Sequence, residues 1–259
     1  MPRHKGAPKE VPTRGEDRAF HGLVIQCLPD LSVGVVKKYM GNPTLLSRRL
    51  RDALVEKAEK VPVVAPAVAG NLDTSFMAAV YEKLFGRVPN FSGLAIPAKP
   101  ENLGPMRLIV VAKEIVDWTG NRPLQGTQNA LKKHFKCYQY TDDLDESVLV
   151  NARDPRKGTY ALWVKDIREA DEENANKSAN DLARDNHLGI TILERQLLEM
   201  DYFEEHGEHM DLNNVTLCSG SRGRDGGVVD ADWRGVGFFV RWYYPSDRDS
   251  YLRSRSVNL

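Results

Sequence analysis

The chain has 259 residues, of which 41% are hydrophobic and 28% are charged, and its formal net charge is zero. This composition is typical of a globular protein and excludes a collagen, a coiled-coil rod and a wholly disordered chain. The longest apolar runs, at residues 61–69 and 108–112, are much shorter than the ~18 residues that a membrane-spanning helix needs, so we expect no membrane span.

The N-terminal 20 residues are charged and rich in proline, and no apolar segment of signal-peptide length follows them. We expect a flexible segment over residues 1–20 and, by default, a cytoplasmic location. Cys27, Cys137 and Cys218 lie far apart without CxxC spacing, which favours neither a disulfide framework nor a zinc site.

The charges divide the chain into two halves. Residues 1–140 contain 21 Lys and Arg against 12 Asp and Glu, a net charge of +9, whereas residues 141–259 contain 15 against 24, a net charge of −9. Such asymmetry is typical of two domains with different partners. It predicts a basic, mainly helical accessory domain over residues 21–144, followed by a second domain over residues 145–259.

Helical patterns dominate the basic half. They predict helices over 43–58, over 74–86 with Thr74 as N-cap and Gly86 as the stop, and over 105–120, and a fourth that starts at Thr127 and carries Leu131 and Phe135. Basic residues on the polar sides of these helices form either a solvated face or contacts with phosphate. These are Arg48, Arg49, Arg51, Lys132, Lys133 and Lys136.

The second half changes from helix to strand along its length. Residues 158–165, GTYALWVK, alternate like a half-buried strand, and Thr191 with Glu194 forms a capping box for an amphipathic helix that ends at Gly207. Beyond Leu212 the segments NVTLCSGS, GVGFFVRWYY and LRSRSVNL are typical of short strands. This order predicts an α+β domain whose first and last strands could pair.

The last 49 residues have an unusual composition. Residues 211–259 contain seven Arg and six Asp but no Lys, Glu, Gln or Met, although residues 1–210 contain 15 Lys and 16 Glu. Proportion predicts about seven Lys and Glu together, so their absence by chance has a probability on the order of one in a thousand. Replacement of the adenines in AAC or AAT codons explains it, because Arg, Asp, Gly, Ser, Tyr and Phe are then reachable whereas Lys, Glu, Gln, Met and Trp are not.

The C-terminal part, with the run LCSGSRGRDGGVVDADWRGVGFFVRWYYPSDRDSYLRSR, resembles the variable proteins of diversity-generating retroelements. The resemblance covers about residues 145–259 and implies a C-type-lectin fold in which adenine-specific mutagenic reverse transcription rewrites a variable region at about 218–255. It implies that the segments 217–222 and 252–255, with Trp233, Val240 and Trp242, are constant. The implied ligand-binding positions are Gly223, Arg224, Asp230, Asp232, Arg234, Val236, Phe239, Arg241, Tyr243, Tyr244, Ser246, Asp247, Asp249, Ser250 and Tyr251.

The residue types independently favour a binding surface, because Tyr, Phe and Arg among Gly, Ser and Asp are typical of antibody paratopes. Alternation along residues 238–244 places Phe239, Arg241 and Tyr243 on one face, which we expect to bind. The other face carries Phe238, Val240, Trp242 and Tyr244, and we assign Val240 and Trp242 to the core. The alternative is that all these aromatic residues form the core of an ordinary strand.

Other chemistry is weakly indicated. The motif EEHGEHMD offers His206 and His209 but no third fixed metal ligand, and the calcium motifs EPN, QPD and WND of sugar-binding lectins do not occur. The formylglycine-generating enzymes, which share the lectin fold, need two active cysteines, whereas this half has Cys218 alone. The segment GSRGRDGG lacks the strand and helix context of a phosphate-binding loop.

These observations favour a non-enzymatic protein that binds a protein or another macromolecule through a hypervariable surface, without a metal or cofactor. One alternative is a nucleic-acid-binding protein that uses the basic N-terminal half, whose affinity would fall steeply with salt. A second is a structural assembly protein whose aromatic C-terminal face is an obligate contact between subunits.

Overall fold

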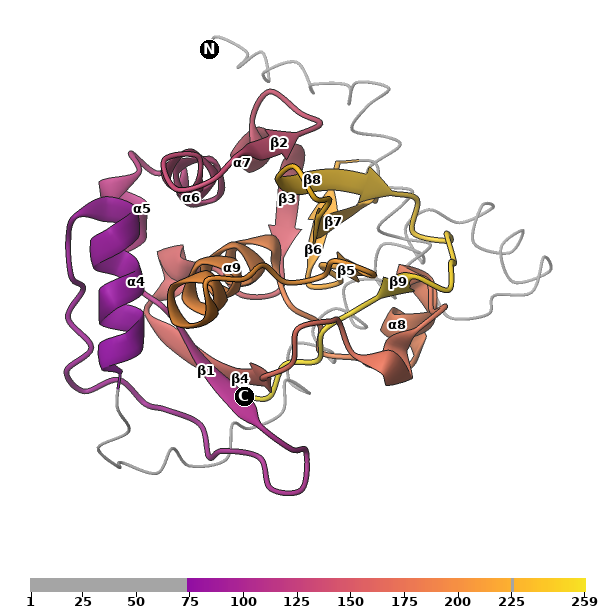
Figure 1. The fold of residues 1–259 in the computed structure, drawn as a ribbon, viewed down its shortest axis with the longest axis horizontal. Coiled ribbons are helices and arrows are strands. Elements are labelled where there is room, and N and C mark those ends of the chain that lie inside the picture. The colour runs from indigo at the N-terminus through magenta and orange to yellow at the C-terminus, as the bar shows by residue number, and fades with distance from the viewer. Residues whose placement is uncertain (1–73, 225) are drawn as a thin grey trace, which may run out of the picture. The chain divides into compact units, whose positions relative to one another are not determined.

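The computed structural model describes residues 74–224 and 226–259, which lie within one compact unit. The helices are α4 (Ser75–Phe85), α5 (Glu114–Trp118), α6 (Pro123–Leu131), α7 (Leu144–Ser147), α8 (Ala179–Arg184) and α9 (Ile192–His206), with the 3-10 turns η1 (Pro155–Lys157) and η2 (Glu172–Asn174). The strands are β1 (Met106–Val111), β2 (Cys137–Gln139), β3 (Val148–Asn151), β4 (Tyr160–Lys165), β5 (Val215–Leu217), β6 (Ser221–Gly223), β7 (Val228–Trp233), β8 (Phe238–Tyr243) and β9 (Leu252–Arg253) (Figure 1).

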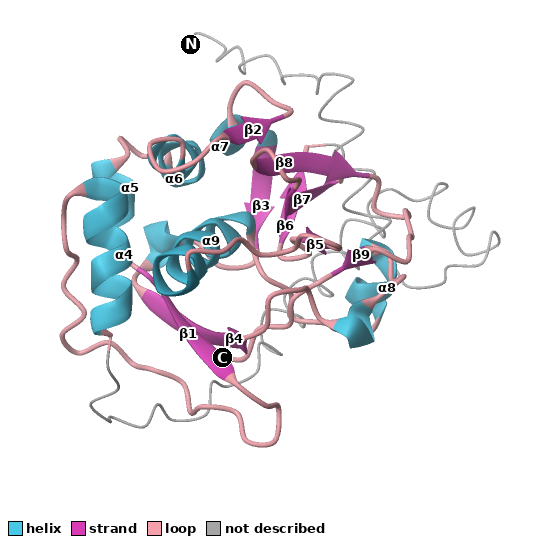
Figure 2. Ribbon diagram, viewed as in Figure 1, coloured by secondary structure: helices cyan, strands magenta, loops and turns pink. Residues whose placement is uncertain are grey.

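The strands form three sheets around the central helix α9 (Figure 2). The largest sheet has the order β2-β8-β7-β5-β9, in which β2 pairs with β8 and β5 with β9 in parallel, whereas β7 is antiparallel to both its neighbours. The pairs β1–β4 and β3–β6 are antiparallel two-stranded sheets. The described residues thus have a mixed α+β structure with a strand-rich C-terminal part, as the sequence predicts.

Helix α9 begins and ends where the sequence predicts. The Thr191 side chain accepts from the Glu194 amide, and the Glu194 carboxylate accepts from the Thr191 amide at 2.8 Å, which completes the capping box. At the other end Gly207 adopts the left-handed conformation, with φ of 63°, that suits glycine at a helix C-terminus. Residues 192–202 of this helix are all buried.

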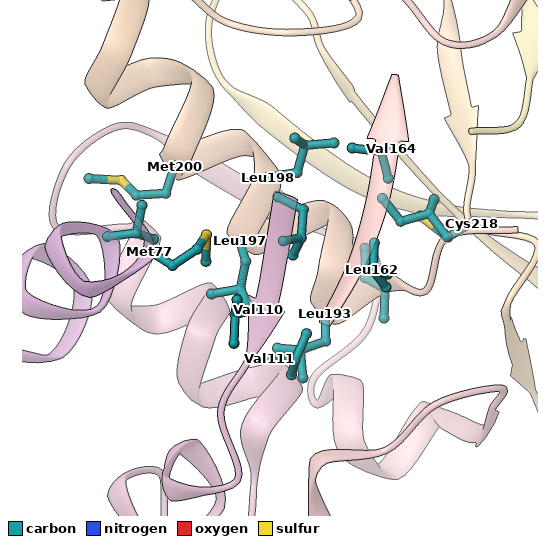
Figure 3. Packing of buried hydrophobic residues seen from close by; sticks show 14 of the residues in the cluster. Met77, Val110, Val111, Leu162, Val164, Leu193, Leu197, Leu198, Met200 and Cys218 are labelled. Carbon is teal, nitrogen blue, oxygen red and sulfur yellow. The ribbon is translucent and has the colours of Figure 1, made fainter. Parts of the chain in front are cut away.

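The main core surrounds α9. Figure 3 shows Leu193, Leu197 and Leu198 of this helix packed against the paired strands β1 and β4, which contribute Val110 and Leu162. Met77 of α4 and Cys218, which follows β5, belong to the same cluster. The helix therefore joins the N-terminal and C-terminal parts of the described chain in one hydrophobic core.

Helix α4 confirms the predicted helix over 74–86. Its apolar stripe of Met77, Val80, Tyr81 and Leu84 is buried, and Gly86 ends it in the left-handed conformation. The Thr74 side chain, however, makes no capping hydrogen bond. The predicted helix over 43–58 lies outside the described residues.

The predicted helix over 105–120 is wrong for its first half. Residues 106–111 form strand β1, and a short helix, α5, follows at Glu114–Trp118. The β-branched run Ile109–Val111 favours a strand, and burial of almost every residue of β1 produces a continuous apolar run that also satisfies a helical pattern. Periodicity alone does not separate these two structures.

The fourth predicted helix starts earlier than expected. Helix α6 begins at Pro123, the first helical position that proline favours, and the Thr127 hydroxyl donates to the Pro123 carbonyl at 2.6 Å instead of capping the helix. The helix ends at Leu131, so Phe135 lies beyond it. Phe135 packs edge-on against Trp233 with ring centroids 5.7 Å apart.

The predicted boundary between residues 144 and 145 does not divide the described chain. Strand β1 pairs with β4, and β2 pairs with β8, so strands on both sides of residue 144 share sheets. The last part of the chain returns to β4, since the backbones of Trp163 and Asn258 exchange two hydrogen bonds of 2.9 Å. The segments predicted as the first and last strands, 158–165 and 252–259, therefore meet at one isolated bridge, although β3 precedes β4 and pairs with β6 instead.

The strand predicted at 158–165 is confirmed as β4. It is buried on both faces, whereas the alternation predicts burial of one face only.

Within residues 74–224 and 226–259, no helix has both the length and the apolar character needed to cross a membrane.

Candidate ligand-binding surface

Strand β8 separates a core face from an outer face. Phe238 and Val240 are completely buried, and the partly buried Trp242 packs against the same core. Phe239 and Arg241 alternate with them and are half-buried on the opposite face. The predicted alternation and the assignment of Val240 and Trp242 to the core are confirmed. We call the side of the five-stranded sheet that carries Phe239 and Arg241 the outer face.

An aromatic pair lies at the β2 end of the outer face. Tyr138 is directly opposite Phe239 in the parallel β2–β8 pair, and their rings stack with centroids 4.6 Å apart and an angle of 17°. A Cβ atom at Gly237 would lie 2.8 Å from the Tyr138 ring and 2.6 Å from the Lys136 carbonyl. The absence of a side chain at residue 237 therefore allows β2 and the Tyr138 ring to approach β8.

Arginines and aspartates alternate across the middle of the outer face. The Arg241 Nη2 donates to both Asp230 and Asp232 at 2.8 Å, and Arg234 Nε donates to Asp232 at 2.8 Å. Asp230 and Asp232 are 0% and 3% exposed, whereas half of the Arg234 side chain is exposed. Two cations thus offset two carboxylates, and the cluster has little net charge.

The pKa of the Asp230 carboxyl in this cluster is shifted from its ordinary value. Burial raises the pKa of its carboxyl to about 6, although the Arg241 guanidinium acts in the opposite direction. Within the described chain no donor reaches its Oδ1 atom, so Arg241 supplies the side-chain hydrogen bonds to this carboxylate. Arg241 is therefore needed to keep a buried negative charge in the sheet.

The other end of the outer face is covered. Helix α8 packs Leu182 over Leu217 and Val228, and the partly buried Tyr243 packs against this second small core. The Tyr243 hydroxyl lies 3.2 Å from the hydroxyl of Tyr251. Tyr243 is therefore less available to a partner than its position in the alternation predicts.

The loop that follows β8 is exposed. Tyr244 is 74% exposed because β8 ends at Tyr243 and the alternation that would have turned residue 244 toward the core ends with it. Its amide donates to Asp247 at 3.0 Å, and Arg248 forms a 2.6 Å hydrogen bond with Asp181 of α8. The expectation that Tyr244 shares the core face is wrong.

The fifteen implied positions differ in exposure. Seven are exposed, and we call them the exposed set: Arg224, Arg234, Val236, Tyr244, Ser246, Ser250 and Tyr251. Five are half-buried: Phe239, Arg241, Tyr243, Asp247 and Asp249. The remaining three, Gly223, Asp230 and Asp232, are buried, which corrects the expectation that they contribute surface. Since β7 and β8 form a hairpin, Arg234 and Val236 lie at its turn, whereas Arg224 and the 244–251 loop lie at its open end.

Arg255, one of the residues that the resemblance implies to be constant, belongs to a buried ion network. Arg255, 0% exposed, binds Asp211 and also donates to the carbonyls of Ile167 and Arg168 at 3.0 and 2.8 Å. Arg195 binds the same Asp211 and, at 2.7 Å, Glu199. This network fixes the chain to the core just after the 244–251 loop, near the C-terminus.

The weaker sequence motifs form structural contacts. His209 Nδ1 lies 2.9 Å from Glu199, and its ring stacks on Trp233. Burial raises the pKa of the Cys218 thiol well above its usual value, which disfavours a reactive thiolate. Within the two described ranges, no three His, Cys, Asp or Glu side chains are grouped as metal ligands.

Sequence reasoning missed the contribution of β2. Tyr138 and Tyr140 are 41% and 67% exposed, and Tyr138 extends the aromatic surface of Phe239 although it lies outside the variable region. The alternation of exposed Lys136, Tyr138 and Tyr140 with Cys137 and Gln139 carries the signal of a short edge strand.

Comparison with known proteins identifies no relative of this chain. No protein-family description, no curated protein and no solved structure matches this chain.

Proposed function

We propose that this protein is a non-enzymatic binding protein whose C-terminal segment displays a surface diversified by adenine-specific mutagenic retrohoming. Its ligand is a protein or another macromolecule. The observation that carries the proposal is the composition of residues 211–259, which use Arg and Asp but no Lys, Glu, Gln or Met. Burial of Val240 and the arrangement of the exposed set support it, because changes at exposed positions leave the core untouched.

We also propose a C-type-lectin-like arrangement for residues 145–259, within a larger unit to which β1 and β2 also contribute. The bridge between Trp163 and Asn258 brings β4 and the C-terminal end of this segment together, and the 244–251 loop is irregular apart from its turns. The buried Arg255 network supports the same view, since it holds the chain firmly on the C-terminal side of the loop. Such a frame would tolerate replacement of its outward side chains.

The test is a comparison of two libraries of the full chain. The first randomises the exposed set with the residues that adenine replacement in AAC codons provides. The matched control randomises seven core positions with the same codons: the partly buried Trp242 and the buried Leu217, Val229, Ala231, Phe238, Val240 and Leu252. Most members of the first library should melt within about 5 °C of the parent, since exposed substitutions cost little, and most members of the second should be unfolded.

Selection of the folded first library against lysozyme, as a probe protein ligand, then tests binding itself. We expect clones of micromolar affinity or better whose binding is lost when the parental residues are restored. Equal loss of folding in both libraries would contradict the proposed frame. A folded library that yields no lysozyme binder would contradict the proposed binding surface and would favour an assembly role, for which Phe239→Ala together with Tyr243→Ala should abolish oligomers.

A further inference from the structure

A cleft lies outside the candidate surface, among α4, α5 and α6. Its volume is about 220 Å³, and it is formed largely by residues at the C-terminal ends of α4 and α5 and along α6. Figure 1 shows these three helices on the side of the described unit that is opposite to α8. The volume is smaller than the ~300–1,000 Å³ of sites for drug-sized ligands, so an occupant must be small.

One wall of the cleft is aromatic. Trp118 and Phe85 both line it, with ring centroids 5.9 Å apart, and Trp118 is held from behind by an edge contact with the buried Tyr81 at 6.0 Å. Close approach between helices fixes this wall, because a Cβ atom at Gly126 of α6 would lie 2.3 Å from the Thr119 side chain. Such a wall suits a flat apolar group.

The polar groups of the cleft include two cationic donors. Arg87 and Lys133 line it, both are exposed, and neither forms an ion pair within residues 74–224 and 226–259. The Arg87 guanidinium lies 6.0 Å from the centre of the Trp118 ring. Asn129 accepts from Gln125 at 3.0 Å through its Oδ1 atom, which leaves its amide group as a donor. Among the residues that the structure describes, no carboxylate lines the cleft.

We propose that this cleft binds a small planar aromatic anion of the aromatic-carboxylate class. The ring of the ligand packs against Trp118 and Phe85, and its carboxylate accepts hydrogen bonds from Arg87 and Lys133. Two cations without carboxylate partners beside an aromatic wall favour an anion over a neutral or cationic ligand. This site is separate from the outer face of the five-stranded sheet.

The experiment titrates benzoate into the full chain and follows the indole N–H signals of its four tryptophans by NMR. A Trp118→Phe variant assigns the Trp118 signal. We expect that signal to shift and to saturate with a Kd on the order of 1 mM. Benzamide, which lacks the charge, and cyclohexanecarboxylate, which lacks the aromatic ring, should each bind at least about tenfold more weakly.

Substitutions separate the proposed contacts from general charge effects. Arg87→Gln and Lys133→Gln should each weaken benzoate binding about tenfold, because each removes a charge-assisted hydrogen bond. The matched control, Lys113→Gln, removes an exposed lysine that does not line the cleft and should leave the Kd unchanged. Binding of benzamide as tight as that of benzoate would overturn the proposal. The proposal would also be overturned if Lys113→Gln weakened benzoate binding as much as the other two substitutions do, or if the Trp118 signal did not shift. Arg87 and Lys133 would then have only the role of stabilising helix C-termini.

Discussion

Replacement of Arg241 by leucine should destabilise the fold in a pH-dependent way. The substitution keeps an apolar side chain on the outer face but removes the hydrogen bonds to Asp230, whose carboxylate is 0% exposed. Removal of one partner of a buried ion pair costs about 3–5 kcal/mol, because the remaining charge is left without compensation. The 16% exposure of the Arg241 side chain places the expected loss near the lower limit, at about 3 kcal/mol at pH 7.5.

The pH dependence follows from the protonation of Asp230. Its pKa is about 6 in the folded protein, above the ordinary value of 3.8, so the folded state binds this proton more tightly than the unfolded state does. The resulting contribution to the free energy of unfolding is fully present below about pH 4 and is lost as the pH rises through 6, and it amounts to about 3 kcal/mol. Without Arg241 the carboxyl is neutral at pH 5, so Arg241→Leu should cost less there than at pH 7.5.

Urea unfolding of five proteins at pH 5 and pH 7.5 provides the measurement: the parent, Arg241→Leu, Asp230→Asn, their double variant and a control. Asp230→Asn should reduce the cost of Arg241→Leu in the double variant, because no buried charge then remains unpaired. Arg234→Leu is the matched control, since Arg234 is half exposed and Asp232 keeps Arg241, and it should cost less than about 1 kcal/mol. Equal costs for the two arginine substitutions, or a cost of Arg241→Leu that does not change with pH, would refute the reasoning.

Further predictions concern packing, the buried network and the nucleic-acid alternative. Trp242→Ala should cost about 3 kcal/mol in urea unfolding, because it opens a cavity beside the main core, and a cost under 1 kcal/mol would contradict its place on the core face. Arg255→Met should cost about 3–5 kcal/mol, since Asp211 loses one of its two arginines; full stability would show that the network is dispensable. A double-mutant cycle of Tyr138→Ala and Phe239→Ala should give a coupling free energy of unfolding of about 0.5–1.5 kcal/mol. Additive effects would show that the stacked rings do not stabilise each other. The full chain should bind a single-stranded oligonucleotide weakly, and tight binding that falls steeply with salt would instead support the nucleic-acid alternative.

Local signals predicted the elements that they determine. The capping box at Thr191 and Glu194 with Gly207 at the other end defines α9 within its own sequence, so both ends were predictable. Alternation predicted the two faces of β8, because the side-chain period of a strand depends only on its backbone. Helix α8 is not predicted, although Ser178 and Asp181 form a capping box. Its six residues include too few apolar side chains to give a helical periodicity.

Long-range pairing was not predictable from local patterns. Residues 106–111 form a strand because β4 lies beside them, and their apolar run fits a helix equally well. The burial of Asp230 has the same origin, since it depends on Arg241, eleven residues later, and on Leu217, which lies opposite Asp230 in β5. The contribution of Tyr138 depends on the parallel pairing of β2 with β8, which joins residues 101 positions apart, as in the pair Tyr138 and Phe239.

Sequencing of the DNA around this gene tests the proposed diversification most directly. The account predicts a nearby non-coding near-copy of the codons for residues 218–255, next to a reverse-transcriptase gene, in which almost every difference falls at an adenine. Those differences should change the codons of the exposed set and spare that of Trp242. The absence of such a copy, or differences spread equally over the four bases, would contradict the claim that this surface is rewritten.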